Sequence, residues 1–422
     1  MLRIIYHWFL LAALASNALL AEEPLPLPVP DTEIESESIV GFSLEELEAM
    51  ALSHPAITEA AGKVRAARGE YIQAGLYPNP VVGYLGSEIG NEGRGGQQGG
   101  FLEQEFVTSH KLDLQQQAAC WEIRRREQLL AEVQLGVLCA VRIRYYEAAI
   151  AERAIAVATD VRDASQQGLK LTEQRKAAKE VSDVDVLQSR FELDSAKVTV
   201  AQSEAELFGA RQRLEAALGG MSLADLPIAE FPMSELPNWA WEDAWTRVRT
   251  ESPSLAALQL DIERARWNLR RQIAGRIPNV TIQAIVQDDH ATGYTVAGAQ
   301  IGMPLPFYNC NEGNIEQARG ELLAATRAVG RLEAELQAKL ATVFREFQSA
   351  RTQAETYREQ MLPDADRAFK LVKVAYGSGD MDYLRLLSAQ QNYSRTHLAY
   401  LKTLQTVWTR HAVIGGLLTA ED

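Results

Sequence analysis

Two short segments with strand-like alternation stand between long helical stretches, and this arrangement restricts the possible folds more than any other feature of the sequence. The second of them runs from Val280 to Gln287 with a period of two, which predicts a strand whose two faces meet different environments. The hydrophilic stretch DDHATG follows and predicts the tip of a hairpin. The apolar side of the predicted strand consists of Val280, Ile282, Ala284 and Val286.

A comparable segment occurs earlier in the chain, where VVGYLGSEIG is followed by a glycine-rich turn and then by FLEQEF. Prolines bracket both segments. Because proline has no N–H to donate to a sheet, it marks the places where strands begin and end. We therefore predict one hairpin over about residues 78–107 and another over about residues 278–306. The entries and exits of the hairpins are marked by Pro78, Pro80, Pro278, Pro304 and Pro306.

Net charge and cysteine content argue against several classes of protein. The chain of 422 residues has a formal net charge of −14, which argues against a nucleic-acid partner, because phosphates attract basic surfaces. Three cysteines are an odd number for a disulfide framework. Cys120 and Cys139 would lie on one helix, about 28 Å apart at about 1.5 Å per residue, and cannot pair with each other.

The N-terminal region has the pattern of an export signal. Residues 1–21 combine a positive end, the apolar run WFLLAAL and a stretch of small residues, which predicts a signal peptide cleaved after Ala18 or Ala21. Residues 22–41 are rich in proline and then acidic, which predicts an extended linker. No other stretch approaches a transmembrane helix, so any membrane that the chain spans would have to be crossed by strands.

The rest of the sequence is predominantly helical. After the first hairpin we predict helices over about residues 111–178, 186–218, 241–250 and 253–276. A long helix follows the second hairpin, Pro363 should kink it, and the turn GSGDMD precedes the final helix from Tyr383. The long helix should bury a seam in steps of three and four: Ile315, Ala318, Leu322, Ala325, Val329, Leu332, Leu336, Leu340, Val343, Phe347, Ala350, Ala354, Tyr357 and Met361.

The two hairpins belong to two similar halves about 200 residues apart, a spacing typical of a duplicated domain and much longer than that of solenoid repeats. YPNP at residue 77 corresponds to IPNV at residue 277, and LKLTEQ at residue 169 corresponds to FKLVKV at residue 369. We predict a first repeat over residues 42–226 and a second over residues 227–422.

Over Phe42 to Leu417 the sequence resembles the TolC-like outer-membrane efflux channel family. The resemblance rests on the YPNP and IPN hairpin entries, the exit MPLPFYNCNEGNIEQA and the turn AYGSGDMDYLRLLSAQQNY, in this order and duplicated. Within the family the chain looks most like the outer-membrane subunits of heavy-metal (cobalt-zinc-cadmium type) resistance-nodulation-division systems. That branch usually has an arginine where Cys310 stands.

The resemblance implies a mainly α fold with a small β part. Three copies would share twelve strands in an outer-membrane β-barrel, with a periplasmic barrel of long coiled-coil helices. It also implies a passive exit duct that conducts substrates, heavy-metal cations among them, from a periplasmic adaptor and an inner-membrane pump. Physical reasoning independently requires an oligomer. Four strands per chain leave edges that lipid cannot satisfy, and single-chain membrane barrels have about eight strands or more.

Four aspartates fall at the two helix turns farthest from the hairpins, and two interpretations of them remain open. Rings of carboxylates would attract cations at the periplasmic entrance and could close it by hydrogen bonds. Aspartate also caps helix starts. On the final helix, the positions of the family's gate aspartates carry Arg385 and Ser388, so gating would rest on other contacts. The entrance candidates are Asp183, Asp185, Asp380, Asp382 and Arg385.

The sequence contains no motif for catalysis, and we predict neither an enzyme nor a cofactor. The histidines and cysteines lack the spacing of a metal site, so we predict no bound metal. Two alternatives to the efflux channel remain. One is a secreted periplasmic coiled-coil scaffold or adaptor that never enters a membrane, which the long helices fit but the hairpins do not. The other is a channel for type I protein secretion.

Overall fold

The computed structural model describes residues 41–90, 95–223 and 235–419. The predicted signal peptide, nearly all of the predicted linker and the predicted boundary between the repeats at residues 226 and 227 lie outside these ranges. By its contacts the chain divides into residues 1–40 and residues 41–422, and all that follows concerns the second unit.

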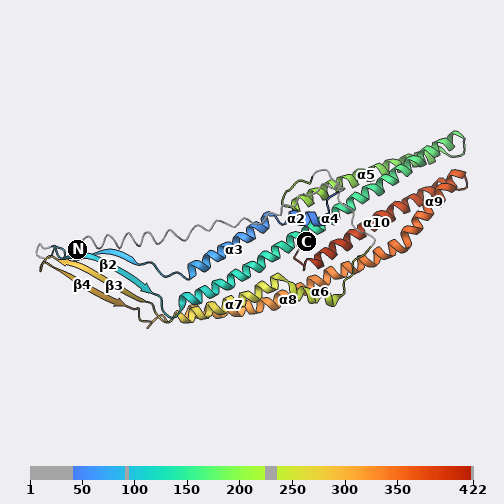
Figure 1. The fold of residues 1–422 in the computed structure, drawn as a ribbon. Coiled ribbons are helices and arrows are strands. Elements are labelled where there is room, and N and C mark those ends of the chain that lie inside the picture. Colours follow the sequence, from blue (N-terminus) through green and yellow to red (C-terminus); the bar gives the residue numbers. More distant parts are fainter. Residues whose placement is uncertain (1–40, 91–94, 224–234, 420–422) are drawn as a thin grey trace, which may run out of the picture. The chain divides into compact units, whose positions relative to one another are not determined.

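Helices and strands occur in the same order in the two halves (Figure 1). The first half contains α2 (Leu44–Ala51), α3 (Pro55–Ala74), β1 (Val81–Ser87), β2 (Gln97–Phe106), α4 (Lys111–Ala177) and α5 (Asp183–Ala217). The second contains α6 (Trp241–Glu251), α7 (Pro253–Ala274), β3 (Val280–Asp289), β4 (Tyr294–Gly302), α8 (Glu312–Thr356), the π-helical turn η2 (Tyr357–Met361), α9 (Leu362–Ser378) and α10 (Tyr383–Gly415). This order supports the duplication that we infer from the sequence.

Capping residues explain where several helices begin. Ser43 caps α2 through a capping box, in which its backbone N–H donates to Glu46 over 2.8 Å. Our prediction for the start of α5 was three residues too late. Ser182 caps that helix, and its N–H donates to Asp185 over 2.9 Å, so the helix already begins at Asp183. The sequence S-x-x-D is itself a capping signature.

The interruption expected at Pro363 is present, and it takes the form of a π-helical turn over Tyr357–Met361 directly before the proline. Proline lacks the N–H that would continue the α-helical ladder, so the preceding turn adopts a different bonding pattern. The corresponding helix of the first half, α4, continues without interruption for 67 residues, or about 100 Å. The two halves therefore differ at this one place in their long helices.

The four strands form one antiparallel sheet in the order β1-β2-β3-β4. Both hairpins are thus confirmed, and the two pair with each other through β2 and β3. The register places Ile282 opposite Ile301 and Ala284 opposite both Leu102 and Ala299. Directly opposed residues share a face, so the apolar residues of different strands gather on one side of the sheet. The other side carries the glutamate residues of β2 and the threonine and glutamine residues of β3, together with the opposed pair Phe101 and Ile285.

All five predicted prolines lie just outside the strands, and three carry carbonyls that accept hydrogen bonds at the junctions between strands and helices. The carbonyl of Pro78 accepts from Gln104 Nε2 over 2.9 Å. This bond satisfies a polar side chain that β2 places on the apolar face. The carbonyl of Pro278 accepts from Thr108 Oγ1 over 2.7 Å and joins the two hairpins at their base.

Asn279, the asparagine of the IPN sequence, links three elements at this base. Its Oδ1 accepts from Lys111 Nζ over 2.5 Å and from the N–H of Thr108 over 3.3 Å. Its Nδ2 donates to Glu105 over 2.7 Å. One side chain therefore ties the start of β3 to the end of β2 and to the first residue of α4.

We expect Asn279→Ala to lower the free energy of unfolding by about 1–3 kcal/mol, because it leaves partly buried charged groups without a hydrogen-bond partner. Thermal unfolding of the detergent-solubilised protein, followed by circular dichroism, measures the change. Asn314→Ala is the matched control, since Asn314 bonds only to Asn311 on an exposed surface. Equal melting temperatures for the two variants would contradict the linking role of Asn279.

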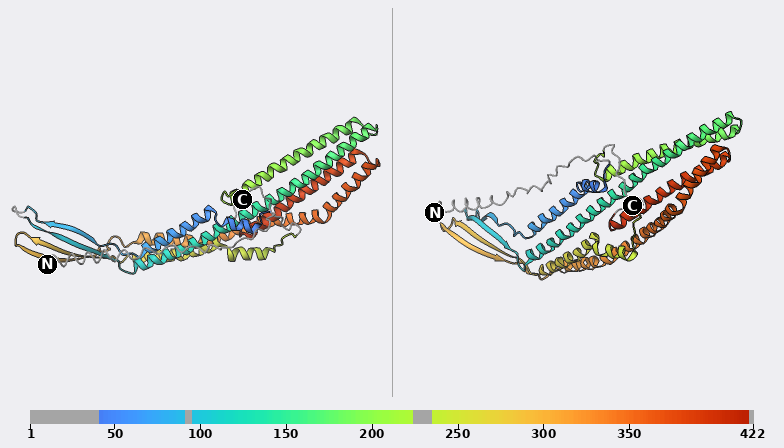
Figure 2. Two further views of the ribbon diagram at one scale, coloured as in Figure 1. Left: turned by 45° about the horizontal axis from the view of Figure 1, so that its top comes forward. Right: turned by 45° about the vertical axis from the view of Figure 1, so that its right-hand side comes forward.

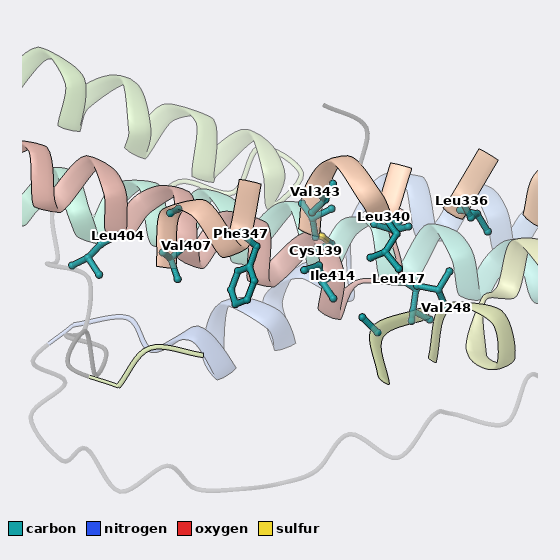
Figure 3. Packing of buried hydrophobic residues seen from close by; sticks show 14 of the residues in the cluster. Cys139, Val248, Leu336, Leu340, Val343, Phe347, Leu404, Val407, Ile414 and Leu417 are labelled. Atoms are coloured by element: carbon teal, nitrogen blue, oxygen red, sulfur yellow. The ribbon is translucent and has the colours of Figure 1, made fainter. Parts of the chain in front are cut away.

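The largest buried cluster lies between α8 and α10 (Figure 3). Phe347 of α8 lies beside Val407 of α10, Leu340 lies farther along α8 beside Leu417, and Cys139 of α4 belongs to the same cluster. Every fully buried residue of α8 belongs to the predicted seam, which confirms the helical period read from the sequence. Met361, predicted at the end of the seam, is exposed because it lies in the π-helical turn, which shifts the side-chain period.

A histidine in the last turns of α10, His411, is held in its neutral form. Trp239 Nε1 donates to His411 Nδ1 over 2.8 Å, which requires an unprotonated nitrogen. Burial lowers the pKa of His411 below its usual value, and the positive charges of Arg142 and Arg247 lower it further. The unfolded chain therefore binds a proton at this site more readily than the folded chain does.

This difference predicts that acid destabilises the fold through His411. Stability from the neutral imidazole is fully present above the ordinary histidine pKa of 6.5 and is lost as pH falls through the lower pKa of the folded state. We expect His411→Gln to flatten the dependence of the melting temperature on pH over this range. His290→Gln, at an exposed turn, should leave the dependence unchanged. A wild-type slope retained in His411→Gln would contradict the assignment.

Candidate functional site at the paired helix turns

Two helix turns lie side by side at the end of the molecule opposite the sheet (Figures 1 and 2). One joins α4 to α5 over residues 178–182, and the other joins α9 to α10 over residues 379–382. The sequence analysis predicts the periplasmic entrance at these two turns. The structure places all four candidate aspartates at these turns.

The aspartates of the first turn have partners within the turn. Asp185 accepts from the N–H and the hydroxyl of Ser182 over 2.9 and 2.8 Å, which completes the capping box of α5. Asp183 forms an ion pair with Lys176 of α4. Both interactions are local and hold the turn together, so capping, one of the two interpretations of the sequence, applies here.

The second turn is built in the same way. Asp382 caps α10 by accepting from the N–H of Arg385 over 3.1 Å, and Asp380 accepts from Ser378 Oγ over 2.6 Å. The Arg385 side chain is exposed. Capping occupies one carboxylate oxygen of Asp382 and leaves the charge directed toward solvent. The same residue can therefore cap a helix and contribute to an acidic ring.

Contacts between the two turns come from residues that the sequence analysis did not select. Tyr376 of α9 is fully buried, and its hydroxyl lies 2.8 Å from Thr172 Oγ1 of α4. Arg175 Nη1 donates to the carbonyl of Tyr376 over 3.2 Å, and its guanidinium lies 4.9 Å from the centre of the Tyr376 ring. Tyr383 packs edge-on against Tyr376 with ring centres 6.0 Å apart. We call Thr172, Arg175, Tyr376 and Tyr383 the turn-end cluster.

Further polar contacts continue the turn-end cluster along the helices. Gln390 of α10 donates to the hydroxyl of Ser165 of α4, and both side chains are buried. Burial raises the pKa of Tyr383 to about 12, although a hydrogen bond with Ser189 lowers it in part. Tyr383 therefore stays neutral at any physiological pH. Polar contacts buried between helices of different halves specify one arrangement, and breaking them is costly.

Chemically, this arrangement can hold helices together or release them. Within the described ranges, no group of three or more histidine, cysteine or acidic side chains is placed to hold a metal ion. Between different helices of these ranges, one histidine contacts a carboxylate: His397 lies 2.8 Å from Asp366, close to the π-helical turn.

No helix of the described part has both the length and the apolar character that crossing a membrane would require.

The sheet is the second candidate site, because its register brings together the residues that the sequence predicts on an apolar face. Ile282, Ala284 and Val286 are exposed, and Val280 is half-exposed. Residues of neighbouring strands on the same face are exposed too: Val82, Tyr84, Leu102, Phe106 and Ile301. So broad an exposed apolar surface marks a contact with something other than water.

Comparison with known proteins gives consistent matches over most of the chain. The Outer membrane efflux protein family matches residues 47–220 and 246–412. The cobalt-zinc-cadmium resistance protein CzcC of Cupriavidus metallidurans is 23% identical over 373 residues, which cover 86% of each chain. The outer-membrane channel OprN has a TM-score of 0.75 at 17% identity, covering 90% of both chains. CusC has a TM-score of 0.74 at 16% identity, covering 95% of this chain and 99% of its own.

Proposed function

The chain belongs to the Outer membrane efflux protein family, and from this premise we propose that three copies form the exit duct of a tripartite efflux system. Members of this family are transport channels and not enzymes. The chain is accordingly an efflux channel of the outer membrane with a helical part in the periplasm. The proposal adds the number of copies, the partners and the substrates.

One observation carries the proposal: the four-stranded sheet has an apolar face, a polar face and two open edges at β1 and β4. Unpaired backbone groups at an edge are not tolerated in lipid, so β1 of one copy must pair with β4 of the next. Because the strands alternate in direction, this contact is antiparallel, like those within the chain. Copies joined in this way close into a ring with the polar face inside.

The helices also present surfaces suited to neighbouring copies. On α5, no other described part of the chain covers an apolar stripe whose residues follow in steps of three, four and seven. Phe191 in this stripe is 74% exposed. Leu384 on α10 is 57% exposed. Such stripes typify helices that pack side by side in a coiled coil. The stripe on α5 consists of Val184, Leu187, Phe191 and Val198.

For the passage of substrate we propose passive conduction, with a periplasmic adaptor and an inner-membrane pump supplying coupling and energy. The acidic turns support cations as substrates, since carboxylates at an entrance concentrate them. The similarity to CzcC supports cobalt, zinc and cadmium ions as the first to test. Asp183, Asp185, Asp380, Asp382 and Arg385 are the proposed entrance residues, and the turn-end cluster is the proposed closure.

The test combines assembly, conductance and transport. Protein from the outer membrane fraction should migrate differently in unheated and boiled gel samples, have the mass of three chains in detergent and conduct ions in planar bilayers. A deletion strain should become sensitive to heavy-metal cations, whereas sensitivity to organic toxins alone, or loss of a secreted polypeptide, would contradict the substrate class. A monomer that is stable without detergent would contradict the duct itself.

A further inference from the structure

The apolar face of the sheet continues past the end of β4 into the loop that leads to α8. Ile301 ends the strand face at 73% exposure, and Met303, Leu305 and Phe307 follow at alternate positions with 52, 61 and 79% exposure. Tyr308 is fully exposed. The loop is therefore continuous with the surface that we propose to face lipid, and its side chains meet the same environment at the periplasmic edge of the membrane.

Positive charge is concentrated directly beside this loop. The segment from Arg264 to Arg276, at the end of α7, contains five arginines and no acidic residue in a chain whose net charge is −14. Asn311 Nδ2 donates to the carbonyl of Gln272 over 2.7 Å, which fixes the end of the loop against this segment. Apolar and basic side chains thus lie next to each other at the junction of sheet and helices.

Three of these arginines are available for a ligand. Arg264 and Arg266 form ion pairs with Asp261 and Glu263 over 2.8 and 2.5 Å. Among the described residues, Arg270, Arg271 and Arg276 have no carboxylate within ion-pair distance. The dipole of α7 favours a cation in its last turn, which accounts for Arg271. It does not account for Arg276, which lies beyond the helix and is exposed.

Each of the two helices that meet here carries a tryptophan–arginine pair. The guanidinium of Arg270 lies 4.5 Å from the ring centre of Trp267 on α7. On α4, Arg124 lies at the same distance from Trp121. Tryptophan and arginine are the residues that concentrate where hydrocarbon gives way to charged headgroups. A guanidinium also offers two parallel N–H donors to a phosphate, which suits it to phospholipid headgroups.

We propose that Arg270, Arg271 and Arg276 bind the phosphates of anionic phospholipids in the periplasmic leaflet of the outer membrane. Residues 303–308 lie among the adjacent acyl chains. This inference rests on the proposed lipid-facing side of the sheet, and it goes beyond the duct because it assigns a lipid partner to the base of the barrel. The acidic character of the rest of the chain makes this segment the place where anionic lipid is attracted.

The experiment uses the full protein reconstituted in phosphatidylethanolamine bilayers that contain a small fraction of brominated lipid. Bromine quenches tryptophan fluorescence on contact, and Trp267 and Trp121 are the nearby reporters. Brominated phosphatidylglycerol should quench more than brominated phosphatidylethanolamine at the same fraction. The triple variant R270Q/R271Q/R276Q should reduce this preference by about five-fold or more, given the attraction of each basic residue to an anionic surface. Rising salt concentration should weaken the wild-type preference.

The control variant R327Q/R331Q/R345Q removes three exposed arginines of α8 and should retain the preference. Equal quenching by both lipids in the wild type, a preference independent of salt, or equal losses in the two variants would overturn the inference. If the glutamine variant does not assemble, the variant R270K/R271K/R276K keeps the charge and should retain most of the preference. A wild type that never inserts into bilayers contradicts the proposed function as well, whereas one that inserts without lipid preference contradicts only this inference.

Discussion

An arginine in place of Ala284 is expected to prevent stable assembly of the protein in the membrane. Ala284 lies in the middle of β3 on the apolar face, opposite Leu102 of β2 and Ala299 of β4. If this face meets lipid, the guanidinium would be placed near the centre of the hydrocarbon layer, at a cost of about 2–4 kcal/mol in each copy. The difference in gel mobility between unheated and boiled membrane samples measures the assembled fraction.

Gln283→Arg is the matched control, because Gln283 is the adjacent residue of the same strand and its side chain lies on the polar face. It should assemble as well as the wild type, since a charge in a water-filled interior stays hydrated. If both variants assemble, or if Gln283→Arg fails where Ala284→Arg succeeds, the proposed orientation of the sheet is wrong.

Replacing Tyr376 by alanine is expected to open the entrance. The ring is fully buried, meets Tyr383 and Arg175, and its hydroxyl reaches Thr172. Removing a buried aromatic side chain costs about 3–5 kcal/mol, and here the loss falls on contacts between α9 and α4 close to the turns. We therefore expect single-channel conductance in planar bilayers to rise, and the strain to become more sensitive to large toxic molecules from outside.

Tyr376→Phe separates the hydroxyl from the ring. It removes only the bond to Thr172, worth about 1 kcal/mol, and should raise conductance far less than alanine does. Wild-type conductance in Tyr376→Ala, with normal assembly, would show that the turn-end cluster is a packing feature without a role in closure.

The sequence predicts the helices and the second hairpin because their signals are local. The seam of α8 follows from its apolar period, and the alternation in β3 identifies a two-faced strand. The first hairpin has a much weaker signal, since glycines interrupt it. Pairing with β3 explains one of these glycines: a Cβ on Gly99 would overlap the carbonyl oxygen of Val286. This requirement comes from a strand about 190 residues away and is not visible within the hairpin itself.

The candidate site, too, could be predicted from the sequence only where its signals are local. The aspartates were predictable at the turns because turn residues have a local signature. The contact between Thr172 and Tyr376 joins residues 204 positions apart, and only the fold reveals it. One indication was available in the sequence: Gln390 continues, in steps of three and four, the apolar series that begins with Tyr383 and Leu386 of the last helix. A polar side chain in such a seam predicts a specific buried partner, which is Ser165.

The π-helical turn at Tyr357–Met361 makes the two halves of the chain mechanically unequal. An unbroken α-helix such as α4 resists bending along its whole length, whereas its counterpart has one weak point, since π turns commonly mark places where a helix deforms. If three copies form a ring, α9 and α10 of each copy would pivot together when the periplasmic mouth widens. The stiffer helical pair that contains α4 would keep its position between them. We therefore expect the backbone amide hydrogens of Tyr357–Met361 to exchange with solvent faster than those of the corresponding stretch of α4.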